Sequence, residues 1–89
     1  MSKTIYKYPL NGPEDYPIIE MPEGAKPLYF NVQGGVPTLW ALVDPEKPTK
    51  RHAFRFAGTG HPIEEDWSYI GSCFHGPFVW HLFDGGEAQ

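Results

Sequence analysis

One cysteine and four histidines are the side chains of this chain best suited to bind a metal ion. Structural zinc sites use four ligands, which usually come in pairs separated by about two to five residues. Cys73 and His75 are separated by one residue, and the sequence holds no second pair. We therefore predict no metal site and no other cofactor. His52 and His81 are expected to lie in strands among aromatic side chains and to hydrogen-bond to backbone carbonyls.

Cys73 and His75 are also the residue types of a nucleophile and its base. With Asp66 or Asp84 as the third member, they could form a catalytic triad. Two strand residues separated by one position share a face and lie roughly 6–7 Å apart. That separation is too large for the hydrogen bond between a nucleophile and its base. We expect Cys73 to be a small buried hydrophobic residue and the protein not to be an enzyme.

A group of basic residues precedes a glycine-rich segment. Arg51 and Arg55 fall on one face of an expected strand, about 13 Å apart. The segment that follows, Gly58-Thr59-Gly60-His61, offers backbone N–H groups that can approach a phosphate closely. This pattern predicts a site for a small anionic, nucleotide-like ligand, with a tryptophan ring stacking on the base. The predicted ligand-binding residues are Arg51, Arg55, Gly58, Thr59, Gly60, His61 and Trp67.

The opposite interpretation of that segment assigns it a purely structural role. The glycines would then only form a turn, because Gly-Thr-Gly falls well short of a phosphate-binding fingerprint. The arginines would pair with the acidic run Glu64-Glu65-Asp66. We otherwise expect that run to be a solvated loop.

The expected strand at 78–83 is apolar on both faces. Phe78, Trp80 and Leu82 alternate with Val79 and Phe83, which flank His81. A small sandwich buries only one face of a strand, so the other needs a cover. Three covers are possible: the 63–67 segment, a second copy of the chain, or a foreign protein that meets an exposed edge. We predict a homo-oligomer whose interface includes Phe78, Trp80, Leu82 and Phe83.

Short strands separated by turn residues account for nearly the whole chain. Ten glycines and ten prolines in 89 residues disfavour long helices. The expected strands span 4–8, 18–21, 28–33, 36–43, 50–57, 68–74 and 78–83, with one helical turn at 63–67. This pattern predicts an all-β fold, a small antiparallel sandwich or barrel of about six to seven strands. A single domain, 1–89, would have its core at 4–84 and a flexible tail at 85–89.

Composition limits the partners. A net charge of −4 argues against non-specific nucleic-acid binding, which requires a basic surface. The single cysteine excludes an intrachain disulfide. The sequence shows no signal peptide and no apolar run long enough to span a membrane, so we expect a cytoplasmic protein without membrane partners.

Four runs resemble a family of small uncharacterised proteins encoded in bacteriophage and prophage genomes. They are IEMPEGAKPL (19–28), GVPTLWALVDP (35–45), FRFAGTGHPI (54–63) and YIG…GPFVWHLF (69–83). GTGHPI and FVWHLF are the most specific parts of the match, which covers about residues 4–84. The resemblance implies a phage origin and a host-cytoplasm setting, and it implies no particular activity.

These observations favour a non-enzymatic phage accessory protein. It would bind and sequester a host factor or a small nucleotide-like ligand, and so counteract host defence. The alternative is an inhibitor that docks on a host protein through an aromatic edge strand. A structural role in the virion is a third possibility.

Overall fold

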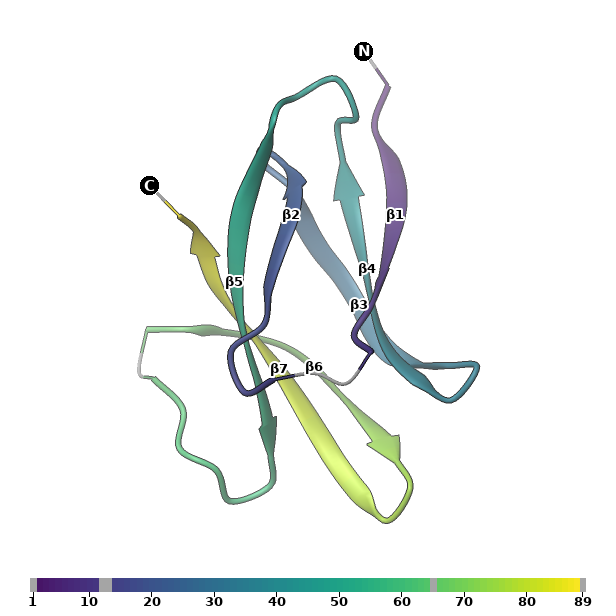
Figure 1. Cartoon of the computed structure of the whole chain (residues 1–89), viewed down its shortest axis with the longest axis vertical. Coiled ribbons are helices and arrows are strands. Elements are labelled where there is room, and N and C mark those ends of the chain that lie inside the picture. The colour runs from purple at the N-terminus through teal and green to yellow at the C-terminus, as the bar shows by residue number, and fades with distance from the viewer. Residues whose placement is uncertain (1, 12–13, 65, 89) are drawn as a thin grey trace.

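Seven strands and the turns between them make up the computed structural model, which describes residues 2–11, 14–64 and 66–88 (Figure 1). Within these residues there is no helix, and hence none that is long and apolar enough to cross a membrane. The strands are β1 (Thr4–Pro9), β2 (Ile18–Pro22), β3 (Lys26–Gln33), β4 (Val36–Val43), β5 (Thr49–Gly58), β6 (Ser68–His75) and β7 (Phe78–Glu87). The predicted all-β fold is confirmed.

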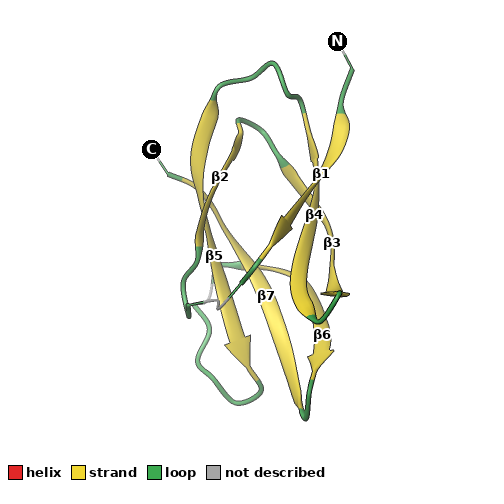
Figure 2. Cartoon of the chain, turned by 45° about the vertical axis from the view of Figure 1, so that its right-hand side comes forward, coloured by secondary structure: helices red, strands yellow, loops and turns green. Residues whose placement is uncertain are grey.

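The strands form two antiparallel sheets packed face to face. Sheet A has the order β1-β4-β3, and sheet B has the order β2-β5-β7-β6. Figure 2 shows β1, β4 and β3 as one layer and β2, β5 and β7 as the other, with β6 passing below β3. Gly71 of β6 lies so close to β3 that a Cβ there would sit 3.5 Å from the Cβ of Phe30. The sandwich is therefore nearly closed along this side.

The core lies between the sheets and is built from alternating residues. In β4, Leu39, Ala41 and Val43 are buried, and in β5 Phe54 and Phe56 belong to the same core. Alternate residues of each strand thus face the opposite sheet, while Arg55 and Ala57 are buried on the outer side of β5. The sequence of β4 is apolar on both faces, which predicts a central strand, and β4 is indeed central because β1 and β3 pair with its two edges.

Glycine makes the tight hairpins between β3 and β4 and between β6 and β7. Gly34 and Gly35 connect β3 to β4 and have φ angles of 57° and 80°. Two positive φ angles in a two-residue loop match the twist of the flanking strands. Gly76, with φ of 64°, begins the two-residue turn between β6 and β7. The run Asn11-Gly12-Pro13 also predicts a turn, but Gly12 and Pro13 lie outside the described residues.

The position of β7 rules out the exposed edge that one of the sequence-based alternatives required. β7 is paired on both sides, with β5 and β6, so it is an internal strand and not an edge. Leu82 points into the core and has no exposed surface, which excludes it from an interface. β7 also continues to Glu87 instead of ending at Phe83, and Gly86 pairs with Ala53. A bulge in this pairing and a φ of 91° at Gly86 let the ladder continue through the segment expected to be a free tail.

Two local expectations are also corrected. The described part of 63–67 is an irregular loop with one backbone–backbone hydrogen bond, from the Trp67 N–H to the Glu64 carbonyl, in place of a helical turn. The alternation of Leu28, Phe30 and Val32 in the sequence predicts that all three face the core. Leu28 is nevertheless exposed, because the pairing of β3 with β4 shifts between Pro27 and Tyr29. A bulge of this kind changes which face the residues beyond it occupy.

Candidate functional site

Arg55 is enclosed by the protein and does not offer its charge to a ligand. The residue is 3% exposed. Its guanidinium donates hydrogen bonds to the carbonyls of Pro62, Asp15 and Phe56 at 3.1–3.3 Å. The ring of Tyr16 covers it, with 4.8 Å from Cζ to the ring centroid. Arg55 therefore holds two loops against β5, those around Asp15 and Pro62.

Arg51 shares the outward face of β5 with Arg55 but lies far from the glycine segment. It pairs with Glu20 of β2 near the start of β5, whereas Gly58 ends the strand. Seven residues of extended chain separate the two by about 23 Å. The structure thus does not bring together the basic residues and the glycine segment on which the anion site was predicted.

The Gly58–His61 segment is a closed turn. The His61 N–H donates to the Gly58 carbonyl at 3.1 Å, and Gly60 has φ of 95°. This geometry corresponds to a type II turn, which favours glycine at its third position. The Gly58 N–H donates to Nδ1 of His61, also at 3.1 Å. A Cβ on Gly58 would lie 3.2 Å from the Trp80 ring and 3.3 Å from the His61 ring, so the absence of a side chain permits this packing.

His81 joins the turn to strand β6 through a chain of hydrogen bonds. Its Nε2 lies 3.0 Å from the Thr59 hydroxyl, and its Nδ1 lies 2.6 Å from the Ser72 hydroxyl. The Ser72 hydroxyl in turn lies 2.7 Å from the Tyr69 hydroxyl. Both ring nitrogens are therefore engaged, and the expected bond from His81 to a backbone carbonyl is replaced by bonds to hydroxyls.

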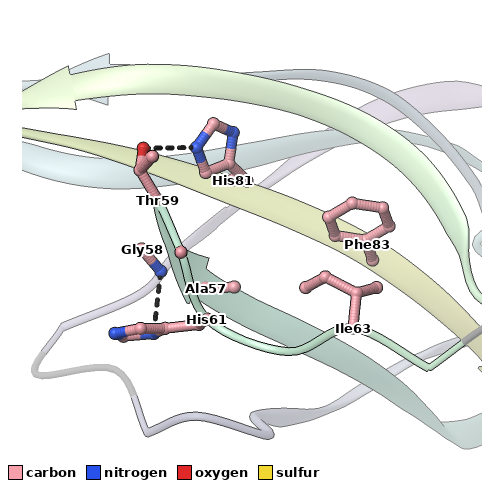
Figure 3. A pocket seen from close by; sticks show the side chains of 8 residues that line it. Ala57, Gly58, Thr59, His61, Ile63, His81 and Phe83 are labelled. Carbon is pink, nitrogen blue, oxygen red and sulfur yellow. Dashed lines mark hydrogen bonds between the residues drawn. The ribbon is translucent and has the colours of Figure 1, made fainter.

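A pocket of about 200 Å³ opens between the turn and the outer face of β7 (Figure 3). Ile63 and Phe83 lie at one end of it and Thr59 and His81 at the other, with Ala57 between them (Figure 3). The pocket is thus apolar with a polar rim, which is the usual composition of a recognition site. Its volume is below the range of about 300–1,000 Å³ typical of ligand pockets and fits one side chain or ring.

The pocket continues onto an uncharged aromatic surface, which we call the β6–β7 face. Its residues pair directly across the two strands and therefore point to the same side of sheet B. They are Tyr69 and Phe83, Ser72 and His81, and Phe74 and Val79. Phe74 is 77% exposed and Tyr69 is 60% exposed. Of these six residues, only Phe83 was predicted from the sequence to belong to an interface.

Phe78 and Trp80, predicted to form an interface, lie on the other side of the same turn. Together with Thr59 and His61 they line a second pocket of about 380 Å³. Phe78 is 59% exposed, whereas the Trp80 ring stacks on Phe56 of the core, with 4.8 Å between centroids. The structure therefore brings part of the predicted ligand loop and part of the predicted interface together around one turn.

Trp67 covers β7 instead of standing free to stack on a ligand. A Cβ on Gly85 would lie 2.7 Å from the Trp67 ring, which shows how closely the indole rests on this glycine. The Tyr16 ring meets the same indole in a T-shaped arrangement, with 5.9 Å between centroids. The segment around Trp67 thus covers part of the outer face of β7. This was one of the three covers considered for that strand from the sequence.

The other two histidines and Cys73 lie in separate environments. Nε2 of buried His52 is 2.8 Å from Asp84, and Nε2 of His75 is 2.9 Å from the Gly35 carbonyl. Cys73 is buried as predicted, and burial raises the pKa of its thiol. Among the described residues, no three His, Cys, Asp or Glu side chains are grouped so that they could hold a metal ion.

A family model described as "Domain of unknown function (DUF7352)" matches residues 1–89. The chain belongs to that family. The predicted resemblance to an uncharacterised family is confirmed in this form, and the phage origin stays a prediction. No curated protein and no solved structure matches the chain. Membership of DUF7352 assigns no activity.

Proposed function

We propose that the protein is a non-enzymatic, phage-encoded accessory protein that binds a partner protein of the host through the β6–β7 face. The observation that supports this proposal is the uncharged aromatic surface around Phe74 and Tyr69, which continues into the 200 Å³ pocket. Interface centres are depleted of charged residues and enriched in aromatic ones. A single apolar side chain of the partner would enter the pocket and contact Ile63 and Phe83.

This proposal changes the predicted mode of docking. The aromatic strand β7 is internal, so it has no free edge for strand pairing, and the outward side chains of β6 and β7 provide the contact instead. Most of the binding energy in such interfaces comes from a few large side chains at the centre. Phe74 and Tyr69 are the large exposed side chains of this face.

Affinity capture from host lysate, treated with nuclease, tests the proposal. The unmodified protein and Phe74→Ala or Tyr69→Ala variants would be immobilised in parallel. We expect a specific host protein that the unmodified chain retains and both variants lose. Tyr29→Ala on sheet A is the matched control, because Tyr29 is similarly exposed (53%) and distant in the fold. Retention of the same proteins by all four baits contradicts the proposal.

A small nucleotide-like ligand is the second candidate, favoured by the two pockets that flank the Gly58–His61 turn. The residues lining these pockets include no lysine or arginine, so a phosphate would depend on backbone N–H groups and imidazoles. Isothermal titration with nucleotides and cyclic oligonucleotides tests this candidate. Heat that disappears in a Thr59→Ala variant supports it, and absence of heat across the panel rejects it.

A further inference from the structure

The outer face of sheet A carries a second exposed aromatic surface, which is far from the β6–β7 face. Residues paired across strands point to the same side of a sheet. On the outer side of β1, β4 and β3, this pairing aligns six residues in two adjacent rows of three. One row is Ile5, Leu42 and Lys26, and the next is Lys7, Trp40 and Tyr29. We call these six residues the sheet A platform.

Two rings form the centre of the platform. The centroids of Tyr29 and Trp40 are 5.6 Å apart and their planes are inclined by 46°. Tyr29 is exposed, and Trp40 is partly exposed between β1 and β3. The Tyr29 hydroxyl accepts a hydrogen bond from the Asn31 side chain, which orients the ring on the surface. Planar faces on a rigid sheet are therefore available to stack against another planar group.

The charge of the platform is opposite to that of the whole chain. The protein has a net charge of −4, yet β1, β3 and β4 contain no aspartate or glutamate. The nearest carboxylate along β4 is Asp44, one residue beyond the strand's end. Lys7 and Lys26 flank the two rings in adjacent rows. Lys7 Nζ lies 2.8 Å from the side-chain oxygen of Gln33, a neutral partner that leaves its charge uncompensated.

We infer that the sheet A platform binds single-stranded nucleic acid. Single strands are bound by aromatic rings that stack on unpaired bases, next to cations that contact the phosphates. The platform supplies both in adjacent rows, with the amides of Asn31 and Gln33 beside them. A duplex offers no exposed base face, and the carboxylates elsewhere on the chain repel its dense charge. The local lysines therefore support single-strand binding, in contrast to the net charge, which argued against non-specific nucleic-acid binding of any kind.

Fluorescence anisotropy with labelled oligo-dT, oligo-rU and a duplex of equal length tests the inference. We expect both single strands to bind and the duplex to bind at least tenfold more weakly. With two lysines contacting phosphates, the logarithm of the binding constant should fall with the logarithm of salt concentration with a slope of about −1.4. Lys7→Ala should reduce the magnitude of this slope by about 0.7.

Substitutions of Tyr29 separate stacking from charge. Tyr29→Ala should weaken binding about tenfold, because one stacked base is lost, while Tyr29→Phe should keep the affinity. Tyr69→Ala on the β6–β7 face is the matched control, with similar exposure on the other sheet, and should bind as the unmodified chain does. Both tyrosines are exposed, so the folded state should survive either change.

Three results would overturn the inference. They are absence of binding to either single strand, equal binding of the duplex, and binding that Tyr29→Ala leaves unchanged. If Tyr29→Ala instead abolishes capture of a nuclease-resistant host protein and no oligonucleotide binds, the platform is a protein-docking surface. The β6–β7 face is tested by Phe74 and Tyr69, so the two proposals can fail separately.

Discussion

At the scale of single residues, the structure separates two arginines that look equivalent in the sequence. Both Arg51 and Arg55 lie on the outward face of β5, but only Arg55 is covered, by Tyr16 and two loops. The carbonyls that enclose Arg55 belong to Asp15 and Pro62, which are 40 and 7 residues away along the chain. Their proximity depends on the tertiary arrangement of the loops, so strand periodicity alone could not predict it.

Substitution of Arg55 should therefore affect stability. Arg55→Met leaves the carbonyls of Asp15, Pro62 and Phe56 without their charged donor. Hydrogen bonds to charged groups contribute about 1.5–3 kcal/mol each, and they do not add fully, so we expect a loss of about 2–4 kcal/mol in the free energy of unfolding. Urea denaturation measures it.

Arg51→Met is the control for that substitution. Arg51 is exposed, and surface changes usually stay within about 0.5 kcal/mol. If the two variants unfold at the same urea concentration, the enclosed arginine does not hold the loops as described. A ligand-binding role for Arg55 would then regain support.

At the scale of strands, the sequence predicted what local chemistry decides. Gly34–Gly35 places β3 beside β4, and the alternation in β5 identifies Phe54 and Phe56 as core residues. The internal position of β7 was not predictable in this way. An apolar pattern on both faces is equally consistent with an internal strand and with an edge that meets a partner.

The β6–β7 face could have been partly found from the sequence. A two-residue turn at Gly76–Pro77 pairs His75 with Phe78, and therefore Phe74 with Val79 and Ser72 with His81. Beyond Gly71 the pairing shifts, and this bulge alone brings Tyr69 opposite Phe83. The bulge has no local signal comparable to a turn, so the full surface required the structure.

Trp67 covers β7 by packing on Gly85. This contact predicts that substitutions at the two positions are coupled in their effect on the free energy of unfolding. Gly85→Ala places a methyl group 2.7 Å from the present position of the indole. We expect it to cost about 1–3 kcal/mol, as for other overpacking substitutions. In a Trp67→Leu background the same change should cost almost nothing.

A double-mutant cycle measured by urea unfolding gives the coupling energy between these two positions. Equal costs of Gly85→Ala in both backgrounds would show that the indole does not rest on this glycine in solution. The outer face of β7 would then need a cover other than Trp67, such as a second copy of the chain.

At the scale of the whole molecule, the two proposed surfaces belong to different sheets and differ in charge. The β6–β7 face has no charged side chain, and the sheet A platform has two lysines. The two sheets are joined through the buried core, so each can present its outer face without rearrangement of the other. One copy of the chain could therefore bind a protein and a single strand together, and a substitution on one surface should leave binding at the other unchanged.

The pH dependence of global stability should reflect one bond between two loops. The Tyr16 hydroxyl donates to Glu64 at 2.6 Å. This bond lowers the pKa of Glu64 and raises the pKa of Tyr16. A carboxyl whose pKa is lowered by folding adds stability above its unfolded pKa and loses that stability as the pH falls through the folded pKa. A phenol whose pKa is raised adds stability below its unfolded pKa and loses it as the pH rises through the folded pKa.

Tyr16→Phe should consequently be less stable than the unmodified chain near neutral pH, and the difference should shrink both in acid and in alkali. Urea midpoints of both proteins, measured between about pH 3 and pH 10.5, would show this as a stability difference that is largest near neutral pH. Glu64→Gln should flatten the acid side of the profile, because the amide that replaces the carboxyl does not titrate. Tyr29→Phe is the control, because the Tyr29 hydroxyl bonds to Asn31, whose side chain does not titrate. The stability difference between this variant and the unmodified chain should therefore not shrink in acid. Parallel profiles for Tyr16→Phe and the unmodified chain would mean that the two loops are not joined by this bond, and that Arg55 alone holds them against β5.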